Sequence, residues 1–515
     1  MRFLHILVIL GLVAVWQPDA YAKTQKSHKK STHHVKSSRI ARATRAKRAL
    51  RAVPAPTSSL ASLNNSDIGN ELASLIAPST STADVAVFAK SMNNGQVLYT
   101  RNINDPMTPA STMKILTAEA ALIFLGGDYR FSTQLLTDAK TIKNGVLQGN
   151  LYVVLTGDPT LTYDDLTDLM TSLRDKQIAA ISGNVYIDNT AYDQRFYGPG
   201  WVVKDKDYCY GAPISASIIN HNCLPLTISP SKVSGRPAEV STSPKFFYPN
   251  IHNAVVTKPY RSRACGLKLS TNPGSAISLD GCMSQGNYAW GLSYVVTDVP
   301  EYNRSLFKNL LARMGVDVYG MVTFGSAGSN LGMIGIHNSE PLRDLIHDML
   351  KKSDNIIAGA IFKKLGQLYT RQQGSWETGN VAVTQILSRY ANVNTKGMRI
   401  LDGSGLSPDN LATAGQMMQV LDYAIHTPKI TDDFISALPI GGIDGTLKHR
   451  LGNIARKVHA KTGTISGVNS LAGYVSARNN QTLGFVILVN GSKGLGWKYK
   501  TMEDKIVTAL SRYDG

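Results

Sequence analysis

The sequence predicts an α+β protein in which one helix-rich domain is interrupted by a β-rich insertion. Helical periodicity is concentrated before about residue 130 and after about residue 336, whereas the part between consists of short β-rich segments broken by Gly and Asn. With 43% hydrophobic and 17% charged residues, the 515-residue chain can bury a sizeable core. Disorder throughout, collagen and a membrane bundle are therefore excluded, and the length suggests roughly three domains.

The first element, residues 1–22, is predicted to be a secretory signal peptide. Met1-Arg2 precedes the apolar run Phe3–Trp16 and the small-residue site Ala20-Tyr21-Ala22. A charged start, an apolar stretch and an Ala-x-Ala site indicate cleavage after Ala22. The alternative is an uncleaved anchor, but the run is shorter than the ~20 residues that span a bilayer. We expect an exported protein with no transmembrane segment after cleavage.

Residues 23–66 are expected to form a basic low-complexity tail and linker. They hold 11 Lys or Arg and no Asp or Glu, so most of the formal net charge of +18 lies here. A solvated tether is the simplest interpretation. The alternative is a polycation that holds the protein to anionic wall or envelope polymers by salt-sensitive attraction. The export signal argues against nucleic acid as a partner.

The helix-rich domain is predicted over 67–130 and 336–515, with the β-rich insertion over 131–335. Its first part contains a strand pair around a turn at residues 93–95 and an Ala/Leu-rich helix that ends near Gly126. Its second part is predicted to contain two strands near 469–477 and 482–489 and a final helix over 501–513. A core-facing helical stripe opens this second part and consists of Leu342, Leu345, Ile346, Met349 and Leu350.

Four cysteines lie within the insertion, and the rest of the chain has none. In an exported protein, an even and clustered set indicates disulfides, for which three pairings are possible. We favour Cys209–Cys223 and Cys265–Cys282, because short loops pair most readily. A zinc site is the alternative, supported only by His221 beside Cys223, since no C-x-x-C pair exists.

Three short motifs that carry chemistry occur in order along the chain. They are Ser111-x-x-Lys114, Ser353-Asp354-Asn355 and Lys461-Thr462-Gly463. Ser-x-x-Lys recurs elsewhere and alone means little, but Lys-Thr-Gly occurs once, and the ordered triple is the active-site set of serine penicillin-recognising enzymes. No metal or organic cofactor is expected.

The spacing of the first motif suits a nucleophile and its base. Residues three apart at a helix start share one face, so Ser111 and Lys114 lie within hydrogen-bond reach. Lys114 can accept the hydroxyl proton only when its amine is neutral, which a nearby cation such as Lys461 and partial desolvation favour. The segment before Lys461 is predicted to be a strand, which at a sheet edge could pair with a peptide substrate and offer an oxyanion donor.

A second Ser-x-x-Lys, at Ser305 and Lys308, is the rival nucleophile motif. It lies closer to Ser353, at a spacing nearer to that of compact β-lactamases. Its segment also carries apolar residues at helical spacing, so we interpret it as ordinary amphipathic packing. Ser111 remains the predicted nucleophile.

The 242-residue separation of Ser111 from Ser353 narrows the choice among families of penicillin-recognising enzymes. Over residues 70–515 the chain resembles the low-molecular-mass class C penicillin-binding proteins of the penicillin-binding protein 4 type, the D-alanyl-D-alanine carboxypeptidase/endopeptidases of peptidase family S13. The segments that carry the resemblance besides the triad are 156–161, 198–201, 350–355 and 401–407. The resemblance implies a transpeptidase-like, serine β-lactamase-like domain with helices around an antiparallel sheet. It also implies a second domain inserted into it and a third nested at about 205–290.

The resemblance further implies a function and residue roles. The chain would hydrolyse D-Ala–D-Ala of peptidoglycan stem peptides and D-Ala–diaminopimelate cross-links through an acyl-enzyme in the periplasm of a Gram-negative-type bacterium, and β-lactams would acylate it. Ser111 would be the nucleophile and Lys114 its base. Ser353 would relay a proton to the leaving amine, and Asn355 would hold the substrate amide. The substrate-carboxylate and oxyanion groups would come from Lys461, Thr462, Gly463, Thr464 and the backbone of Ser111.

Two positions depart from the family pattern. Pro408 stands where family members often carry Arg, and Ser466 where they often carry Gln. In the family, both positions are associated with binding of the diaminopimelate side chain. The preference of this chain for a particular stem-peptide side chain is therefore open. Two other functions are also open. The first is a β-lactamase, which nitrocefin turnover would reveal. The second is a wall-binding scaffold, whose function would persist in Ser111→Ala but would be lost on deletion of residues 23–59.

Overall fold

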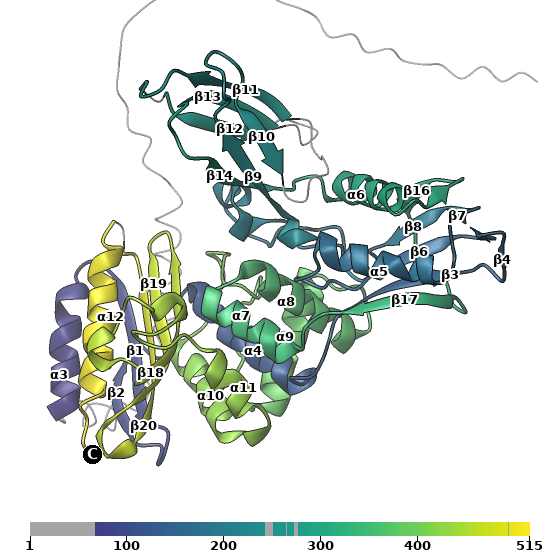
Figure 1. Ribbon diagram of the computed structural model, residues 1–515. Coiled ribbons are helices and arrows are strands. Elements are labelled where there is room, and N and C mark those ends of the chain that lie inside the picture. The colour runs from purple at the N-terminus through teal and green to yellow at the C-terminus, as the bar shows by residue number, and fades with distance from the viewer. Residues whose placement is uncertain (1–66, 243–250, 264, 272–276, 493) are drawn as a thin grey trace, which may run out of the picture. The chain divides into compact units, whose positions relative to one another are not determined.

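A computed structural model describes residues 67–515 except 243–250, 264, 272–276 and 493. The predicted signal peptide over 1–22 and the basic tail over 23–66 lie outside these described residues. The prediction of an α+β fold is confirmed, because helices gather around one antiparallel sheet and further, smaller sheets follow (Figure 1). No helix of the described part is long and apolar enough to cross a membrane.

One five-stranded antiparallel sheet is built from both ends of the folded chain. Its strand order is β18-β19-β20-β1-β2. β1 (Asp84–Ser91) and β2 (Val97–Arg101) form the predicted strand pair. β1 also pairs along its whole length with β20 (Thr482–Asn490), from Asp84↔Asn490 to Ser91↔Leu483. The remaining strands are β18 (Val458–Ile465) and β19 (Val468–Ser476).

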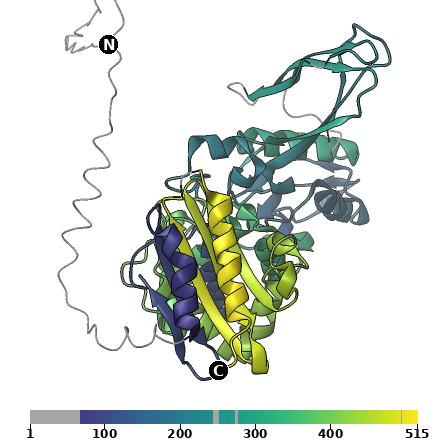
Figure 2. The same ribbon diagram turned by 90° about the vertical axis from the view of Figure 1, so that its left-hand side faces the viewer.

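Helices cover both faces of this sheet, so most residues of its central strands are buried. In β19 eight consecutive residues are buried, from Val468 to Val475. α3 (Asp67–Ile76) and α12 (Gly496–Leu510) lie side by side on one face (Figures 1 and 2). The helical layer on the other face consists of α4 (Met113–Phe124), α7 (Leu342–Lys352), α8 (Asn355–Thr370), α9 (Trp376–Tyr390), α10 (Ala414–His426) and α11 (Pro428–Ala437).

Residues 132–338 contain a second hydrophobic core with sheets of their own. α5 (Tyr163–Asp175) and α6 (Val299–Arg313) contribute their apolar stripes to this core. One sheet has the order β16-β8-β6-β3-β17, from β3 (Ser132–Thr137), β6 (Leu151–Leu155), β8 (Val185–Asp188), β16 (Val322–Phe324) and β17 (Gly332–Asn338). The other has the order β15-β7-β5-β4, from β4 (Ile142–Lys143), β5 (Val146–Leu147), β7 (Ala180–Ile181) and β15 (Asp317–Val318).

A third core lies between two small sheets formed by residues 223–295. Its buried residues include Leu226, Val255 and Leu279. The sheets have the orders β10-β9-β14 and β11-β13-β12. Their strands are β9 (Cys223–Ser229), β10 (Glu239–Thr242), β11 (Ile251–Lys258), β12 (Leu267–Thr271), β13 (Ile277–Ser284) and β14 (Trp290–Val295). The domain boundaries given above stay predictions, including the nested third domain at about 205–290.

Candidate active site

The predicted nucleophile lies in a tight turn at the start of α4. Ser111 belongs to a 3-10 turn, Ala110–Thr112, that runs directly into the helix. Thr112 Oγ1 donates to Pro109 O at 2.6 Å and closes the turn, while Ala110 has a φ of 48° in the left-handed region. A non-glycine residue in that region is strained backbone, of the kind that gathers at functional sites.

Lys114 follows on the same face and is completely buried. Its Nζ lies 3.1 Å from Ser111 Oγ, as the motif spacing predicts, and it also donates to Asn355 Oδ1 at 2.6 Å and to Ser404 O at 2.7 Å. Burial lowers the pKa of Lys114 to about 7, although the carboxylates of Asp402 and Asp354 oppose this shift. A lysine with that pKa is partly neutral near pH 7 and can accept a proton.

The second motif lies at the junction of two helices rather than simply at the end of one. Ser353 ends α7 with a left-handed φ of 60°. The Asp354 carboxylate then caps α8 by accepting from the N–H groups of Ile356 at 2.8 Å and Ile357 at 2.9 Å. Asn355 is the first residue of α8, so its amide reaches Lys114 from a rigid helix start.

Asn355 is oriented by a carbonyl from the inserted region. Its Nδ2 donates to Tyr210 O at 2.9 Å, which leaves Oδ1 to accept from Lys114. Tyr210 lies one residue after Cys209, and the disulfide Cys209–Cys223 closes its loop. The disulfide Cys265–Cys282 is also present, so both pairings that we favoured occur in the structure. The motif analysis missed Tyr210, because a backbone carbonyl leaves no signature in a sequence.

The third motif lies on β18, which is an edge strand as expected. Lys461 is completely buried, and its Nζ donates to Ser353 Oγ at 2.9 Å and to Thr462 O at 2.7 Å. Burial first, and then the charge of Lys114, hold the pKa of Lys461 well below its ordinary value. Burial is thus the largest cause of the pKa shift for both lysines. The charge of a neighbouring cation adds to the shift of Lys461, whereas the further causes at Lys114 are the two opposing carboxylates.

Two glycines approach the backbone of the nucleophile turn closely. A Cβ on Gly463 would lie 2.9 Å from both Pro109 O and Ser111 N. A Cβ on Gly405, whose φ is 81°, would collide with Ala110 O. The loop 403–405 therefore lies beside the nucleophile and is not merely a remote turn.

Asp402 organises that loop from inside the protein. This side chain is fully buried, and its Oδ1 accepts from the N–H groups of Ser404 at 3.0 Å and Gly405 at 2.6 Å. Its Oδ2 accepts from Ser407 N at 2.8 Å and from the indole of Trp201 at 2.6 Å. The two segments 198–201 and 401–407, noted in the sequence for their resemblance, are therefore joined by a hydrogen bond.

Side chains from all three motifs surround one pocket. Three further residues complete it, Thr446, Arg450 and Lys500, and the motif analysis did not identify them. Arg450 donates through Nη2 to Asp504 Oδ1 at 2.7 Å and to Glu503 Oε2 at 2.9 Å, which fixes its guanidinium. Lys500 is on α12, as are Glu503 and Asp504. The sequence alone does not indicate that this helix lies beside the pocket. The complete lining is Ser111, Ser353, Thr446, Arg450, Thr462, Thr464 and Lys500.

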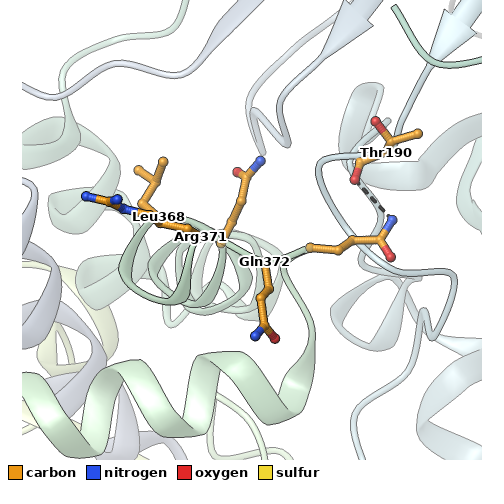
Figure 3. Close-up of a pocket in the computed structure, with 6 residues that line it drawn as sticks. Thr190, Leu368, Arg371 and Gln372 are labelled. Atoms are coloured by element: carbon orange, nitrogen blue, oxygen red, sulfur yellow. Dashed lines mark hydrogen bonds between the residues drawn. The ribbon is translucent and has the colours of Figure 1, made fainter.

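A different pocket lies at the C-terminal end of α8, where Leu368, Arg371 and Gln372 are among the residues that line it (Figure 3). Gln373 Nε2 donates to Thr190 O at 3.0 Å across this pocket (Figure 3). None of the predicted site residues lines it, so it is not the candidate active site.

The rival serine lies in ordinary helical packing. Ser305 is on α6, and its Oγ donates to Glu301 Oε1 at 3.0 Å one helical turn earlier. Its neighbours Leu306 and Phe307 are fully buried in the core of residues 132–338. Among the described residues, no hydrogen bond joins Ser305 to Lys308 or to any residue of the other two motifs.

Comparisons with known proteins agree with this arrangement. A family model described as the D-Ala-D-Ala carboxypeptidase 3 (S13) family matches residues 69–513. The D-alanyl-D-alanine carboxypeptidase DacB of Haemophilus influenzae is 31% identical over 438 residues, covering 84% of this chain and 89% of that protein. The crystal structure of penicillin binding protein 4 (dacB) from Haemophilus influenzae has a TM-score of 0.76 at 30% identity and covers 86% of this chain and 99% of that one. The same protein complexed with a β-lactam has a TM-score of 0.71 at 29% identity and covers 86% and 100% of the two chains.

Proposed function

The chain belongs to the D-Ala-D-Ala carboxypeptidase 3 (S13) family and is a serine-type D-Ala-D-Ala carboxypeptidase; from this premise we propose that its natural substrates are peptidoglycan stem peptides. It cleaves their terminal D-Ala–D-Ala bond, and also D-Ala–diaminopimelate cross-links, through an acyl-enzyme on Ser111. One observation carries the proposal: Ser111 and Ser353, each hydrogen-bonded to a buried lysine, line the same pocket.

The contacts of Lys114 support its role as the base. Asn355 Oδ1 and Ser404 O can only accept hydrogen bonds, so a neutral amine directs both of its N–H groups at them. Its lone pair then faces the hydroxyl of Ser111, takes that proton, and leaves Oγ free to attack the D-Ala carbonyl. The backbone N–H groups of Ser111 and Thr464 stabilise the developing oxyanion.

Ser353 and Lys461 serve the leaving group. Lys461 Nζ donates to Ser353 Oγ, which places a hydroxyl in position to pass a proton to the departing amine. The terminal carboxylate of the substrate binds at Thr462 and Lys461, with Gly463 and Thr464 lining the strand beside it. Asn355 holds the substrate amide with the second N–H of its Nδ2, because the bond to Tyr210 O uses only one of the two N–H groups.

β-Lactams acylate the same serine, because their strained amide resembles the scissile bond. The β-lactam complex of the Haemophilus influenzae relative supports this part of the proposal. We place the enzyme in the periplasm, after cleavage at Ala22. The two disulfides support an oxidising compartment of this kind.

Intact mass after treatment with benzylpenicillin tests the nucleophile. Wild type and Ser305→Ala should each gain one penicilloyl group, and Ser111→Ala should gain none. An adduct that survives Ser111→Ala and disappears in Ser305→Ala would move the site to α6. Nitrocefin turnover by the wild type would favour a β-lactamase, and no reaction of any kind would favour the scaffold.

The two peptidase activities are separated by the choice of substrate. Purified stem pentapeptide reports D-Ala release, and a D-Ala–diaminopimelate cross-linked dimer reports endopeptidase cleavage. Ser111→Ala should abolish both. Release of D-Ala without cleavage of the dimer would remove the endopeptidase part of the proposal and keep the carboxypeptidase.

A further inference from the structure

The two small sheets formed by the described part of residues 223–295 are called the small β domain below, and three of its loops gather at one end of these sheets. They are residues 230–238, 258–263 with 265–266, and 284–290, which we call the tip loops. Gln285 joins them, since its backbone N–H donates to Lys258 O at 3.0 Å and its side chain donates to Lys232 O at 2.8 Å. Ser284 Oγ adds a bond to Pro259 O at 3.0 Å, and the disulfide Cys265–Cys282 ties the second loop to β13. The tip loops therefore form one surface.

This surface carries positive charge and no acidic residue of its own. The tip loops contain no Asp or Glu. Their basic residues are all exposed, and no ion pair between described residues involves any of them. These basic residues are Lys232, Arg236, Lys258, Arg261 and Arg263.

Aromatic side chains stand among these cations. Tyr288 is 96% exposed, Tyr260 64% and Trp290 44%. The Arg261 guanidinium lies over the Tyr260 ring, 5.3 Å from its centroid. Large aromatic rings placed in water lose the benefit of burial, so a group of them at one place indicates a binding surface.

We propose that the tip loops bind peptidoglycan, with the aromatic rings stacking on sugar rings and the cations pairing with the free carboxylates of the stem peptides. This inference rests on the proposed function for the choice of polymer, but it assigns a second contact with that polymer outside the catalytic pocket. Binding the chain at a second point raises the effective concentration of substrate at the pocket.

The composition of the tip loops favours a glycan over a lipid surface. A loop that inserts into a bilayer presents Leu, Ile or Phe beside its Trp. The tip loops contain no Leu, Ile, Met or Phe, and their one exposed aliphatic side chain of any size is Val233, at 59%. Tyr and Arg instead offer flat faces and hydrogen-bond donors, which suit sugar rings and carboxylates.

Co-sedimentation with purified sacculi tests the proposal. All proteins carry Ser111→Ala so that the sacculi are not digested. Tyr260→Ser/Tyr288→Ser is compared with Tyr319→Ser/Tyr390→Ser, whose side chains are 67% and 55% exposed outside the tip loops. Since neither change alters the net charge, the basic residues 23–66 contribute equally to both. We expect Kd for sacculi to rise roughly tenfold in the first pair, from the loss of two ring contacts, and to stay unchanged in the second.

A second comparison tests the cations. Arg261→Gln/Arg263→Gln should weaken binding more than Arg174→Gln/Arg389→Gln, which removes the same number of exposed charges elsewhere. Equal binding by the tyrosine variant and wild type would overturn the proposal. The proposal would also be overturned if the tip-loop variants lost the wild type's binding to vesicles of anionic phospholipid but bound sacculi as well as the wild type does. That pattern would identify the tip loops as a membrane-binding surface.

The failure of this proposal is distinguishable from failure of the proposed function. With Ser111 restored, both tip variants should release D-Ala from a soluble pentapeptide at the wild-type kcat/KM, because that substrate is too short to need a second contact. Loss of this activity in the variants would show that the changes disturb the fold rather than a polymer contact.

Discussion

The role that we propose for Lys114 depends on its complete burial, and this sets the pH dependence that we expect for acylation. Its pKa is lowered to about 7, so the amine is protonated below that pH and cannot accept the Ser111 proton, whereas above it the amine is neutral. The second-order rate of acylation by benzylpenicillin should rise about tenfold per pH unit below 7 and level off above it.

Lys364 supplies a matched control for this pH profile. It is also buried, its pKa is also lowered to about 7, and it lies on α8 outside the active-site pocket. Lys364→Met should therefore leave the pH profile unchanged. A wild-type rate that goes on climbing to pH 9 would mean that Lys114 keeps an ordinary lysine pKa.

Trp201 stabilises the loop beside the nucleophile through one hydrogen bond to a buried carboxylate. Trp201→Phe keeps most of the ring but removes the donor to Asp402 Oδ2. The free energy of unfolding should fall by about 1–3 kcal/mol, the cost of an unsatisfied buried group. Urea denaturation measures this, with Trp497→Phe, a change at a residue 68% exposed, as the control that should leave it unchanged.

At the scale of single residues, the sequence was sufficient to identify those site residues that belong to short motifs. Ser111 and Lys114 are three apart, so a helix start alone brings them together. Tyr210 and Arg450 could not be found in that way. Tyr210 acts through its backbone carbonyl, and Arg450 reaches the pocket because its ion pairs to α12 hold it there.

At the scale of elements, the loop closed by Cys209–Cys223 is connected to the active site by a hydrogen bond. It presents the Tyr210 carbonyl that orients Asn355, whose other amide atom contacts Lys114. Cys209→Ser/Cys223→Ser should lower the acylation rate about tenfold, because small displacements of a positioning group cost rates of this order or more. Stopped-flow acylation by a β-lactam would measure it.

The other disulfide provides the matched comparison. Cys265→Ser/Cys282→Ser opens a loop of similar length in the small β domain, and none of its residues lines the active-site pocket. Its acylation rate should equal that of the wild type. Equal acylation rates for the two double variants would show that the loop closed by Cys209–Cys223 does not position Asn355.

Element boundaries were predicted best where one strong periodic pattern defines the segment. The stripe from Leu342 to Leu350 became α7, and the strand pair around residues 93–95 became β1 and β2. The last helix begins at Gly496, five residues before the predicted start. Its first turn contains Gly496 and the exposed Trp497, whose intrinsic helix propensities are weak, so the sequence pattern did not include them.

At the scale of the whole molecule, the two ends of the small β domain lie next to each other. β9 and β14 pair antiparallel, with Cys223 opposite Val295 and Pro225 opposite Ser293. The small β domain therefore leaves and rejoins the chain at adjacent positions. The resemblance implied a nested domain at about 205–290, and the strand register shows where the chain enters and leaves the small β domain.

Replacing residues 226–292 with a two-residue Asn-Gly turn should leave the catalytic chemistry intact. The turn would join Pro225 to Ser293 as a short hairpin and keep the disulfide Cys209–Cys223. We expect one penicilloyl group per chain at the wild-type rate, measured by intact mass over time. A shortened chain that is folded but unreactive would show that the small β domain supports the active site.

The two glycines that flank the nucleophile turn limit how this enzyme could evolve antibiotic resistance. A side chain at Gly463 or Gly405 would collide with the backbone that carries Ser111, so neither position can acquire a bulky residue to exclude a drug. Variants selected under β-lactam pressure should therefore leave both glycines unchanged. Adaptive changes would instead accumulate at the rim of the pocket, around Thr446 and Lys500, where a larger side chain meets solvent before it meets the catalytic serine.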